Sequence, residues 1–346
     1  MKSERQAPDE SDLDFGPTIR GLQSGLKVFG RYSLVRQIGR GGMGVVWLAW
    51  DERLARDVAL KFLPEMVQGD PVALDELREE TNRSLELTHP NIVRIHDLAE
   101  ESGAAAIVME YVEGQTLSEI RIGTAGKVLE VEEIAGWIEQ ACHALAYAHE
   151  DKKTVHRDLK PANLMVDGEG RLRVMDFGIS GTLTDSMSRL SAAAMPASGT
   201  LVYMSPQQAM GFPPTVSDDI YSLGATIYEL LTGKPPFYRG NIQHQIETLV
   251  APSMAERREQ LGVEGRLEIP ASWERTVAAC LAKGASDRPK NIEAIREALF
   301  YGAHDGGDQG EHSLGNLEKT SPIVSEKSPS PVDREKTPEV PAHGAG

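Results

Sequence analysis

Short apolar runs dominate the chain up to residue 109, and longer helical patterns follow after residue 131. The expected strands are Tyr32–Ile38, Val45–Trp50, Val58–Phe62, Ile92–Asp97 and Ala106–Met109, each bounded by glycine or charged residues. Leucines at helical spacing predict a helix over Pro71–Leu87, and further helices are expected at 131–148, Asp219–Thr232 and Glu274–Lys283. A strand-rich first lobe followed by a helix-rich second lobe predicts an α+β fold.

The two ends of the chain differ from this middle in composition. Residues 1–31 are polar and acidic, and we expect them to form a flexible leader. Residues 303–346 are rich in Gly, Ser, Pro, Glu and Lys and lack aromatic residues, so we expect a disordered tail. One folded domain is therefore predicted over 32–300, with an N-lobe over about 32–109 and a C-lobe over about 113–300.

Charge and cysteine content exclude several classes of partner and of structural site. A formal net charge of −16 repels nucleic acid and anionic lipid, so neither is an expected partner. The only cysteines, Cys142 and Cys280, are far apart, which argues against a disulfide framework or a zinc site and suits a reducing compartment. The chain also lacks a secretory signal and a run of ~20 apolar residues, so the expected location is the cytoplasm.

A glycine-rich segment lies between the first two expected strands. Residues 39–46 read GRGGMGVV, a pattern in which backbone amides can approach phosphate oxygens because no Cβ intervenes. A plain glycine hairpin and a dinucleotide-binding loop are the alternatives, but the second requires a helix where Val45–Trp50 is strand-like. Lys61 ends the next strand, where its ammonium would reach the α- and β-phosphates of a nucleotide.

Two loop motifs farther along carry oxygen-bearing side chains. Residues 156–163 read HRDLKPAN, and residues 176–178 read DFG. Together, Asp158, Asn163 and Asp176 supply hard oxygen ligands beside the expected phosphates, and such ligands suit Mg²⁺.

With these motifs in order, the chain resembles the eukaryotic-type (Hanks-type) protein kinases, and most of all their bacterial serine/threonine branch, over roughly residues 32–300. The resemblance implies a two-lobed kinase fold with ATP in the cleft between the lobes. It also implies that the γ-phosphate of Mg-ATP is transferred to Ser or Thr hydroxyls of protein substrates, in signalling.

The resemblance assigns roles to individual residues. It implies that Asp158 orients or deprotonates the substrate hydroxyl, that Lys160 reaches the transferred phosphate and that Thr200 contacts both. Lys61 would hold phosphates and pair with a helix glutamate, for which Glu80 is the first candidate and Glu79 the second. Mg²⁺ would be held by two residues, Asn163 and Asp176.

The nucleotide would be surrounded by residues of the N-lobe and the hinge. Val46, Ala59 and Met165 would sandwich the adenine, and the backbone of Glu110 and Val112 would bond its edge. The full set implied by the resemblance is Ile38, Gly39, Arg40, Gly41, Gly42, Met43, Gly44, Val46, Ala59, Lys61, Glu80, Met109 as gatekeeper, Glu110, Val112 and Met165.

The segment 199–208 resembles the part of the family that receives the substrate. Asp219 resembles a buried aspartate that anchors the catalytic loop, and Arg288 an arginine that pairs with a glutamate of this segment. Here Gln207 stands in place of that glutamate. We expect the change to lower the stability of the lobe without altering the chemistry, because Arg288 keeps a less compensated charge.

The resemblance also suggests regulation. Loop 179–205 is expected to be mobile when unmodified and to be autophosphorylated, and Arg157 would then join a basic pocket for the phosphate. The candidate acceptors are Ser180, Thr182, Thr184, Ser186, Ser188, Ser191 and Ser198. Related kinases often activate as homodimers, so we keep an activating homodimer as a hypothesis. Docking roles for the Ser-Pro and Thr-Pro pairs in the tail are a second hypothesis.

Two other functions compete with an active protein kinase. A pseudokinase scaffold would bind nucleotide without catalysis, but it would require a lost catalytic residue, and Lys61, Asp158, Asn163 and Asp176 are all present. A small-molecule kinase is disfavoured by the segment 199–208, which is shaped for peptide substrates in relatives.

Overall fold

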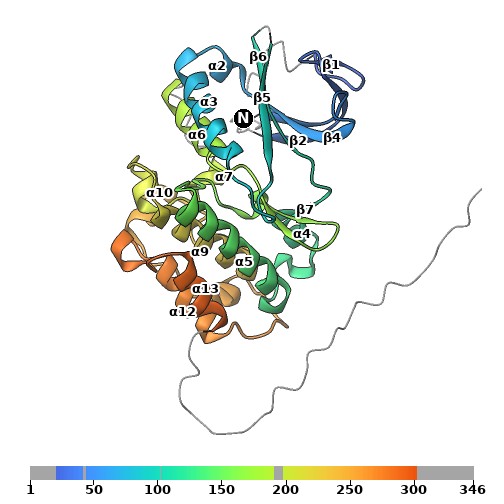
Figure 1. Cartoon of the computed structure of the whole chain (residues 1–346). Helices are drawn as coiled ribbons and strands as arrows, with labels where there is room; N and C mark the ends of the chain where they lie inside the picture. The colour runs from blue at the N-terminus through green and yellow to red at the C-terminus, as the bar shows by residue number, and fades with distance from the viewer. Residues whose placement is uncertain (1–20, 42–43, 102, 191–197, 302–346) are drawn as a thin grey trace, which may run out of the picture. The chain divides into compact units, whose positions relative to one another are not determined.

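The structure is a computed structural model that describes residues 21–301 except 42–43, 102 and 191–197. In this part of the chain, the five expected strands and β1, which the sequence did not predict, form one antiparallel six-stranded sheet with the order β1-β2-β3-β4-β6-β5 (Figure 1). The strands are β1 (Lys27–Val28), β2 (Tyr32–Gly41), β3 (Gly44–Asp51), β4 (Arg56–Phe62), β5 (Ile95–Glu101) and β6 (Ala104–Glu110).

The described part of the expected leader is ordered, so that prediction is wrong for residues 21–31. Lys27 and Val28 form β1 and pair with Ser33 and Tyr32. Phe29 stacks on Phe62, with ring centroids 5.9 Å apart. A few apolar side chains among polar neighbours give no periodic signal, yet they cover the outer face of the sheet. The first twenty residues and the expected tail lie outside the described residues.

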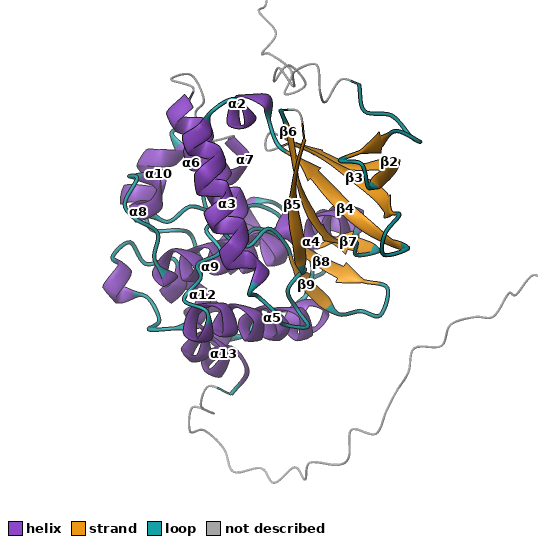
Figure 2. Ribbon diagram, turned by 45° about the horizontal axis from the view of Figure 1, so that its top comes forward, coloured by secondary structure: helices purple, strands orange, loops and turns teal. Residues whose placement is uncertain are grey.

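Two helices border the sheet, α2 (Glu65–Gln68) and α3 (Pro71–Leu85). Helix α3 begins where the sequence predicts, because Asp70 accepts hydrogen bonds from the N–H groups of Val72 and Ala73 and Pro71 fits the first turn. The helix packs against β5 on one side and against α6 (Ile179–Leu190) on another (Figure 2).

The second lobe is mainly helical. Its helices are α4 (Leu117–Gly123), α5 (Val131–Ala146), α7 (Ser198–Leu201), α8 (Pro206–Ala209), α9 (Val216–Thr232), α10 (Ile242–Thr248), α11 (Met254–Gln260), α12 (Ala271–Cys280) and α13 (Ile292–Phe300). A second described sheet contains β7 (Gly114–Thr116), β8 (Leu164–Asp167) and β9 (Leu172–Val174). Helix α9 is buried from Asp218 to Thr232 and forms the centre of the core of this lobe.

This arrangement confirms the predicted α+β, two-lobed fold. None of the helices in the described residues is long and apolar enough to cross a membrane.

The start of the expected mobile loop is a helix, which corrects the prediction for residues 179–190. Ile179 and Leu183 lie one turn apart and are both fully buried in the cluster beneath the first sheet. Met187, one turn farther, packs against the same cluster. This i, i+4, i+8 spacing is a helical stripe, although the surrounding Ser, Thr and Gly residues favour a loop.

Candidate active site

The glycine segment is the turn of the β2–β3 hairpin. Gly39 pairs with Val46 and Gly41 with Gly44, so a strand follows the glycines, which rules out the dinucleotide-binding loop. Gly44 has φ +127°, and a Cβ there would lie 2.0 Å from the carbonyl oxygen of Phe62 on β4. Glycine is therefore required to let the hairpin approach β4. Gly42 and Met43 lie outside the described residues.

Lys61 lies on β4 with 6% of its surface exposed. It is two positions after Ala59, so the two side chains share one face of the sheet, and it stands opposite Val46 of β3. Its Nζ lies 2.7 Å from Oδ2 of Asp176. The N-lobe lysine and the aspartate of the DFG motif are thus brought together, although they are 115 residues apart.

Three of the expected residues gather around Asp158 of the catalytic loop. Lys160 Nζ lies 2.9 Å from Oδ2 of Asp158 and donates to Oγ1 of Thr200 at 3.1 Å. Asn163 Nδ2 donates to the Asp158 carbonyl at 2.7 Å and to its carboxylate at 3.0 Å. Asp158 is only 4% exposed. A carboxylate, an ammonium and a hydroxyl therefore meet at one point.

Asp219 of α9 holds this loop from beneath. Its side chain is fully buried and accepts hydrogen bonds from the backbone N–H groups of His156 (2.7 Å) and Arg157 (2.9 Å). His149 Nε2, in the π-helical turn Tyr147–Asp151, lies 2.7 Å from the same carboxylate. Arg157 has φ +71°, a strained value for a non-glycine residue. The anchor therefore fixes the backbone immediately before Asp158.

His149 is a structural residue that the sequence alone did not reveal. Its spacing suggested only a surface or core histidine, and its bond to Asp219 spans 70 residues of sequence. Burial by itself raises the pKa of Asp219, but the hydrogen bond from His149, aided by charge interactions with His149 and His156, holds that pKa below its usual value of 3.8.

The expected metal ligands carry oxygen atoms of the kind Mg²⁺ prefers. Asn163 offers an amide oxygen and Asp176 a carboxylate, and the two segments are tied by the Met175 N–H, which donates to the Asn163 carbonyl at 2.9 Å. Within the described residues, no cluster of three or more His, Cys, Asp or Glu side chains is arranged to hold a metal. Such a sparse set fits Mg²⁺ that is bound chiefly by nucleotide phosphates.

Several residues expected to contact adenine share one apolar cluster. Ala59 and Met109 are opposite partners on β4 and β6, and Val46 and Val112 pack against the same cluster. Ile38 is more exposed on β2, and Met165 is half-buried on β8.

The hinge residue Glu110 already uses one of its backbone groups. Its N–H donates to the Arg94 carbonyl at 2.8 Å. Its carbonyl is therefore the backbone group it can offer to a nucleotide. The Glu110 carboxylate forms an ion pair with Arg173.

The expected pair of Lys61 with Glu80 is not formed, which corrects that prediction for this conformation. Glu80 lies 2.6 Å from Arg83 on its own helix, while Lys61 is paired with Asp176. The Glu80 carboxylate lies beside Gly178, where an added Cβ would be only 2.0 Å from Oε1, so it borders the segment that leads into α6. The resemblance assigns catalysis to a lysine–glutamate pair together with a metal-bound aspartate, and in this conformation Lys61 contacts Asp176 instead of Glu80.

Gln207 and Arg288 meet as expected. Arg288 donates to Oε1 of Gln207 at 2.6 Å and to the carbonyls of Ala282 and Ser217, both at 2.8 Å. Gln207 Nε2 donates to the Lys283 carbonyl at 2.9 Å. Burial, and after it the charge of nearby Arg288, together lower the pKa of Lys283 to about 8.

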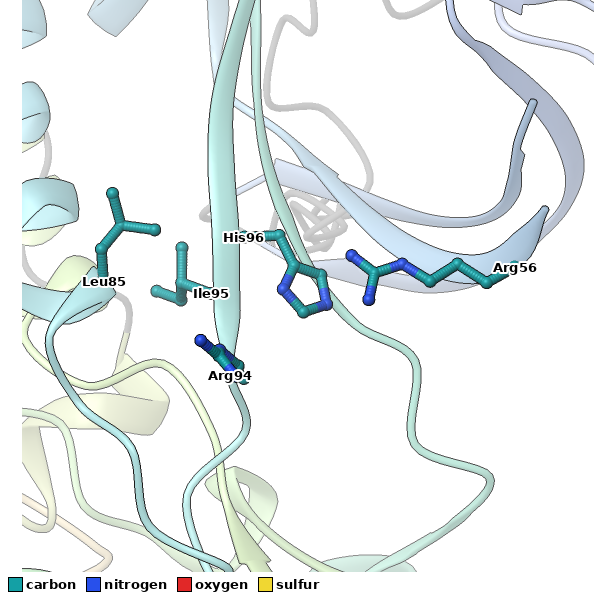
Figure 3. A pocket seen from close by; sticks show the side chains of 5 residues that line it. All are labelled: Arg56, Leu85, Arg94, Ile95 and His96. Atoms are coloured by element: carbon teal, nitrogen blue, oxygen red, sulfur yellow. The ribbon is translucent and has the colours of Figure 1, made fainter. Parts of the chain in front are cut away.

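A cavity of about 330 Å³ lies elsewhere, at the start of β4 and β5 and the end of α3 (Figure 3). It is lined by Arg56, Leu85, Arg94, Ile95 and His96. Burial, followed by the charges of Arg56 and Arg94, lowers the pKa of His96. The cavity contains none of the residues expected to bind nucleotide or to take part in catalysis.

Comparison with known proteins agrees with this geometry. The protein kinase domain family matches residues 32–300. The chain is 35% identical over 322 residues to the serine/threonine-protein kinase PrkC of Bacillus subtilis, a match that covers 91% of this chain and 48% of PrkC. It is 37% identical over 285 residues to the serine/threonine-protein kinase PknB of Mycobacterium leprae, covering 80% of this chain and 43% of PknB.

The chain therefore spans about half the length of these curated relatives. Among solved structures, the PknI kinase domain of Mycobacterium tuberculosis is 27% identical with a TM-score of 0.64, covering 82% of this chain and 100% of that one. Sequence, fold and the gathering of Asp158, Lys160 and Asn163 on one loop agree, and the chain belongs to the protein kinase family, as a eukaryotic-type kinase similar to the bacterial serine/threonine kinases.

Proposed function

We propose that residues 32–300 transfer the γ-phosphate of Mg-ATP to serine and threonine hydroxyls of proteins. The observation that carries this proposal is the contact of Lys160 with both Asp158 and Thr200. It sets a carboxylate that can take a hydroxyl proton beside an ammonium that can neutralise phosphate charge. Lys160 in this position is typical of the serine/threonine kinases that the chain resembles.

Catalysis of phosphoryl transfer depends mainly on positioning of the reactants and on charge neutralisation. Asp158 would orient the substrate hydroxyl and accept its proton. Lys160 would stabilise the negative charge on the phosphoryl group during its transfer. Lys61 would hold the α- and β-phosphates once it leaves Asp176. Asn163 and Asp176 would hold Mg²⁺, which supplies charge neutralisation at the phosphates when it is bound.

Phosphate incorporation from labelled Mg-ATP into a basic protein substrate tests the proposal. Wild type should incorporate label on Ser or Thr, and Asp158→Asn should not, with nucleotide affinity preserved in both. Normal nucleotide binding by both proteins without incorporation by either, even into themselves, would instead support a nucleotide-binding scaffold.

The proposal includes finer points that rest on the family resemblance. Protein substrates are proposed over small molecules because the segment before α9 is fixed to the catalytic loop: Gln208 Nε2 donates to the Arg157 carbonyl at 2.7 Å. A role in signalling, a cytoplasmic location and an activating homodimer are proposed as well. Cell fractionation tests the location, and sedimentation at a series of protein concentrations tests the homodimer.

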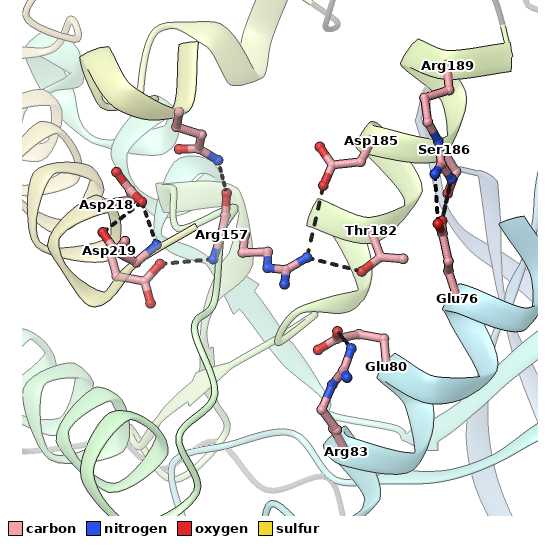
Figure 4. A network of polar contacts seen from close by, with 12 residues as sticks. Glu76, Glu80, Arg83, Arg157, Thr182, Asp185, Ser186, Arg189, Asp218 and Asp219 are labelled. Atoms are coloured by element: carbon pink, nitrogen blue, oxygen red, sulfur yellow. Dashed lines mark hydrogen bonds and ion pairs between the residues drawn. The ribbon is translucent and has the colours of Figure 1, made fainter. Parts of the chain in front are cut away.

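Activation by autophosphorylation within residues 179–205 is also part of the proposal. It is supported by the separate ion pairs of Lys61 with Asp176 and of Glu80 with Arg83 (Figure 4), since the Lys61–Glu80 pair of an active kinase requires a step that frees both side chains. Phosphatase treatment of the active protein should lower its activity, and unchanged activity would contradict this part.

A further inference from the structure

The cavity in Figure 3 has walls of two kinds. Arg56, Arg94 and His96 supply nitrogen-bearing groups, and Leu85 and Ile95 supply apolar carbon. Its volume of about 330 Å³ lies near the lower end of the range of about 300–1,000 Å³ that is typical of small-molecule sites. The cavity therefore has the size and the mixed lining of a site for a small polar ligand.

The two arginines of the cavity are free to bind a ligand. Arg56 lies at the start of β4, and Arg94 directly precedes β5. Within the described residues, neither guanidinium forms a hydrogen bond or an ion pair. The exposed carboxylates of Asp57 and Asp97, close by in sequence, form no ion pair with them. A chain with a net charge of −16 thus places two arginines without an ion-pair partner in one cavity.

Two carboxylates whose charges act on His96 are already paired with other arginines. These carboxylates belong to Asp51 and Glu110. Asp51 accepts hydrogen bonds from Nε and Nη2 of Arg31 at 2.8 and 2.6 Å, and Glu110 forms an ion pair with Arg173. Neither carboxylate is therefore available to neutralise the cavity.

A β-bulge brings His96 to the wall of the cavity. The pairing of β5 with β6 shifts register between Ile95 and Asp97, so His96 is an extra residue without a partner on β6. Bulges of this kind re-aim a side chain and are frequent next to functional sites. In Figure 3, the guanidinium of Arg56 points toward the His96 ring. Burial, followed by the charges of Arg56 and Arg94, lowers the pKa of His96, so at neutral pH the imidazole is neutral and can donate one hydrogen bond to an anion.

We propose that this cavity binds the phosphate group of a small phosphate monoester. Each guanidinium can donate two parallel hydrogen bonds to phosphate oxygens, and His96 can donate a further one. A phosphate monoester carries a charge of about −1.5 to −2 at pH 7, which matches the two arginines, whereas a single carboxylate matches only one. Leu85 and Ile95 give a short carbon skeleton an apolar surface to contact. The site is separate from the proposed kinase activity and does not depend on it.

Calorimetric titration with glycerol 3-phosphate tests the site without any need for catalysis. The full chain is first saturated with a non-hydrolysable ATP analogue and Mg²⁺, so that Lys61 and Lys160 are not available to the probe. Saturable binding is expected with a dissociation constant on the order of 1 mM or below. Inorganic phosphate should bind about two- to fivefold more weakly, because it leaves the apolar wall uncovered. Glycerate, with a carboxylate in place of the phosphate, should bind about tenfold more weakly or worse.

Substitution of the arginines tests where the probe binds. Arg56→Met and Arg94→Met should each weaken binding by about tenfold or more, because each removes charge-assisted hydrogen bonds and keeps much of the side-chain volume. Arg53→Met is the matched control, since this exposed arginine lies in the same turn between β3 and β4 but does not line the cavity. It should leave the affinity unchanged. Glycerol 3-phosphate should also raise the melting temperature of wild type and of Arg53→Met but not of the double variant of Arg56 and Arg94.

Several outcomes would overturn the proposal. One is the absence of saturable binding up to about 10 mM glycerol 3-phosphate. Another is an equal loss in Arg53→Met and in the two cavity variants, which would assign the effect to overall charge. Glycerate or inorganic phosphate that binds as tightly as glycerol 3-phosphate would overturn the assignment of a phosphate monoester. A wild type that binds the probe as expected but never transfers phosphate to proteins would refute the proposed kinase function and still support the site.

Discussion

Replacement of Asp219 by asparagine should weaken both the fold and the catalytic loop. The carboxylate is fully buried and accepts three hydrogen bonds, from His149 Nε2 and from the N–H groups of His156 and Arg157. An asparagine oxygen can take the place of Oδ2, which faces two donors, but its NH₂ group then points at the Arg157 N–H. One bond to a charged acceptor is lost and one buried donor is left unpaired, a cost of about 2–4 kcal/mol.

For a domain of this size, that loss lowers the melting temperature by about 6–12 °C. Because the strained Arg157 backbone is also released, the turnover number should fall by about 10–100-fold while ATP affinity changes little. Thermal unfolding, steady-state kinetics and nucleotide titration measure the three effects. His149→Gln keeps a donor and should lose much less.

The pH dependence gives a second check on the same residue. The folded pKa of Asp219 is below 3.8, so its stabilising effect is full above that pH and disappears as the pH falls through the folded value. The difference in free energy of unfolding between wild type and Asp219→Asn should therefore disappear only in strong acid. A drop in melting temperature of less than about 2 °C at neutral pH would refute the anchoring argument.

Other substitutions test separate parts of the structure. Asp158→Asn should lower turnover by about 10²–10⁴-fold with nucleotide affinity intact. Asp176→Asn should abolish turnover and also the Mg²⁺ dependence of nucleotide binding. Label incorporation measures turnover, and nucleotide titrations with and without Mg²⁺ separate the two variants. Gly44→Ala should destabilise the hairpin by about 1–3 kcal/mol and raise KM for ATP, since its Cβ meets backbone 2.0 Å away; an unchanged KM would contradict this. Gln207→Glu should stabilise the lobe by no more than about 1 kcal/mol in thermal unfolding, because the carboxylate compensates the Arg288 charge better than the amide does but loses the Nε2 hydrogen bond to the Lys283 carbonyl; a lower melting temperature would count against it. Lys283 has a folded pKa of about 8 against its ordinary 10.5, so between these pH values the unfolded state binds more protons than the folded state. The free energy of unfolding should therefore rise with pH from about 8 to 10.5. If a Lys283→Met variant shows the same rise, another group causes it.

Much of the local structure could be predicted because it depends on short-range patterns. The two-residue period of a strand puts Ala59 and Lys61 on one face, and the structure keeps them there. The pattern of glycines followed by a strand favoured a phosphate-binding hairpin over a dinucleotide-binding loop, and the β2–β3 register rules out the latter. Asp158 and Asn163 are five residues apart, so the loop itself holds them together.

Predictions failed where several weak signals compete. The apolar stripe of Ile179, Leu183 and Met187 was hidden among turn-forming residues, and its helix forms because α3 and the sheet cover that stripe. Helix propensity alone is a weak guide to such a segment, since tertiary packing supplies most of its stability.

The sequence by itself determined the family, the α+β class and the identity of the groups that can do chemistry. Tertiary structure alone decided which of those groups meet: Asp219 with a loop more than sixty residues earlier, and Lys61 with Asp176 instead of Glu80. The physical reason is that a residue's type fixes its charge and hydrogen-bonding capacity, whereas its partner depends on how distant segments pack.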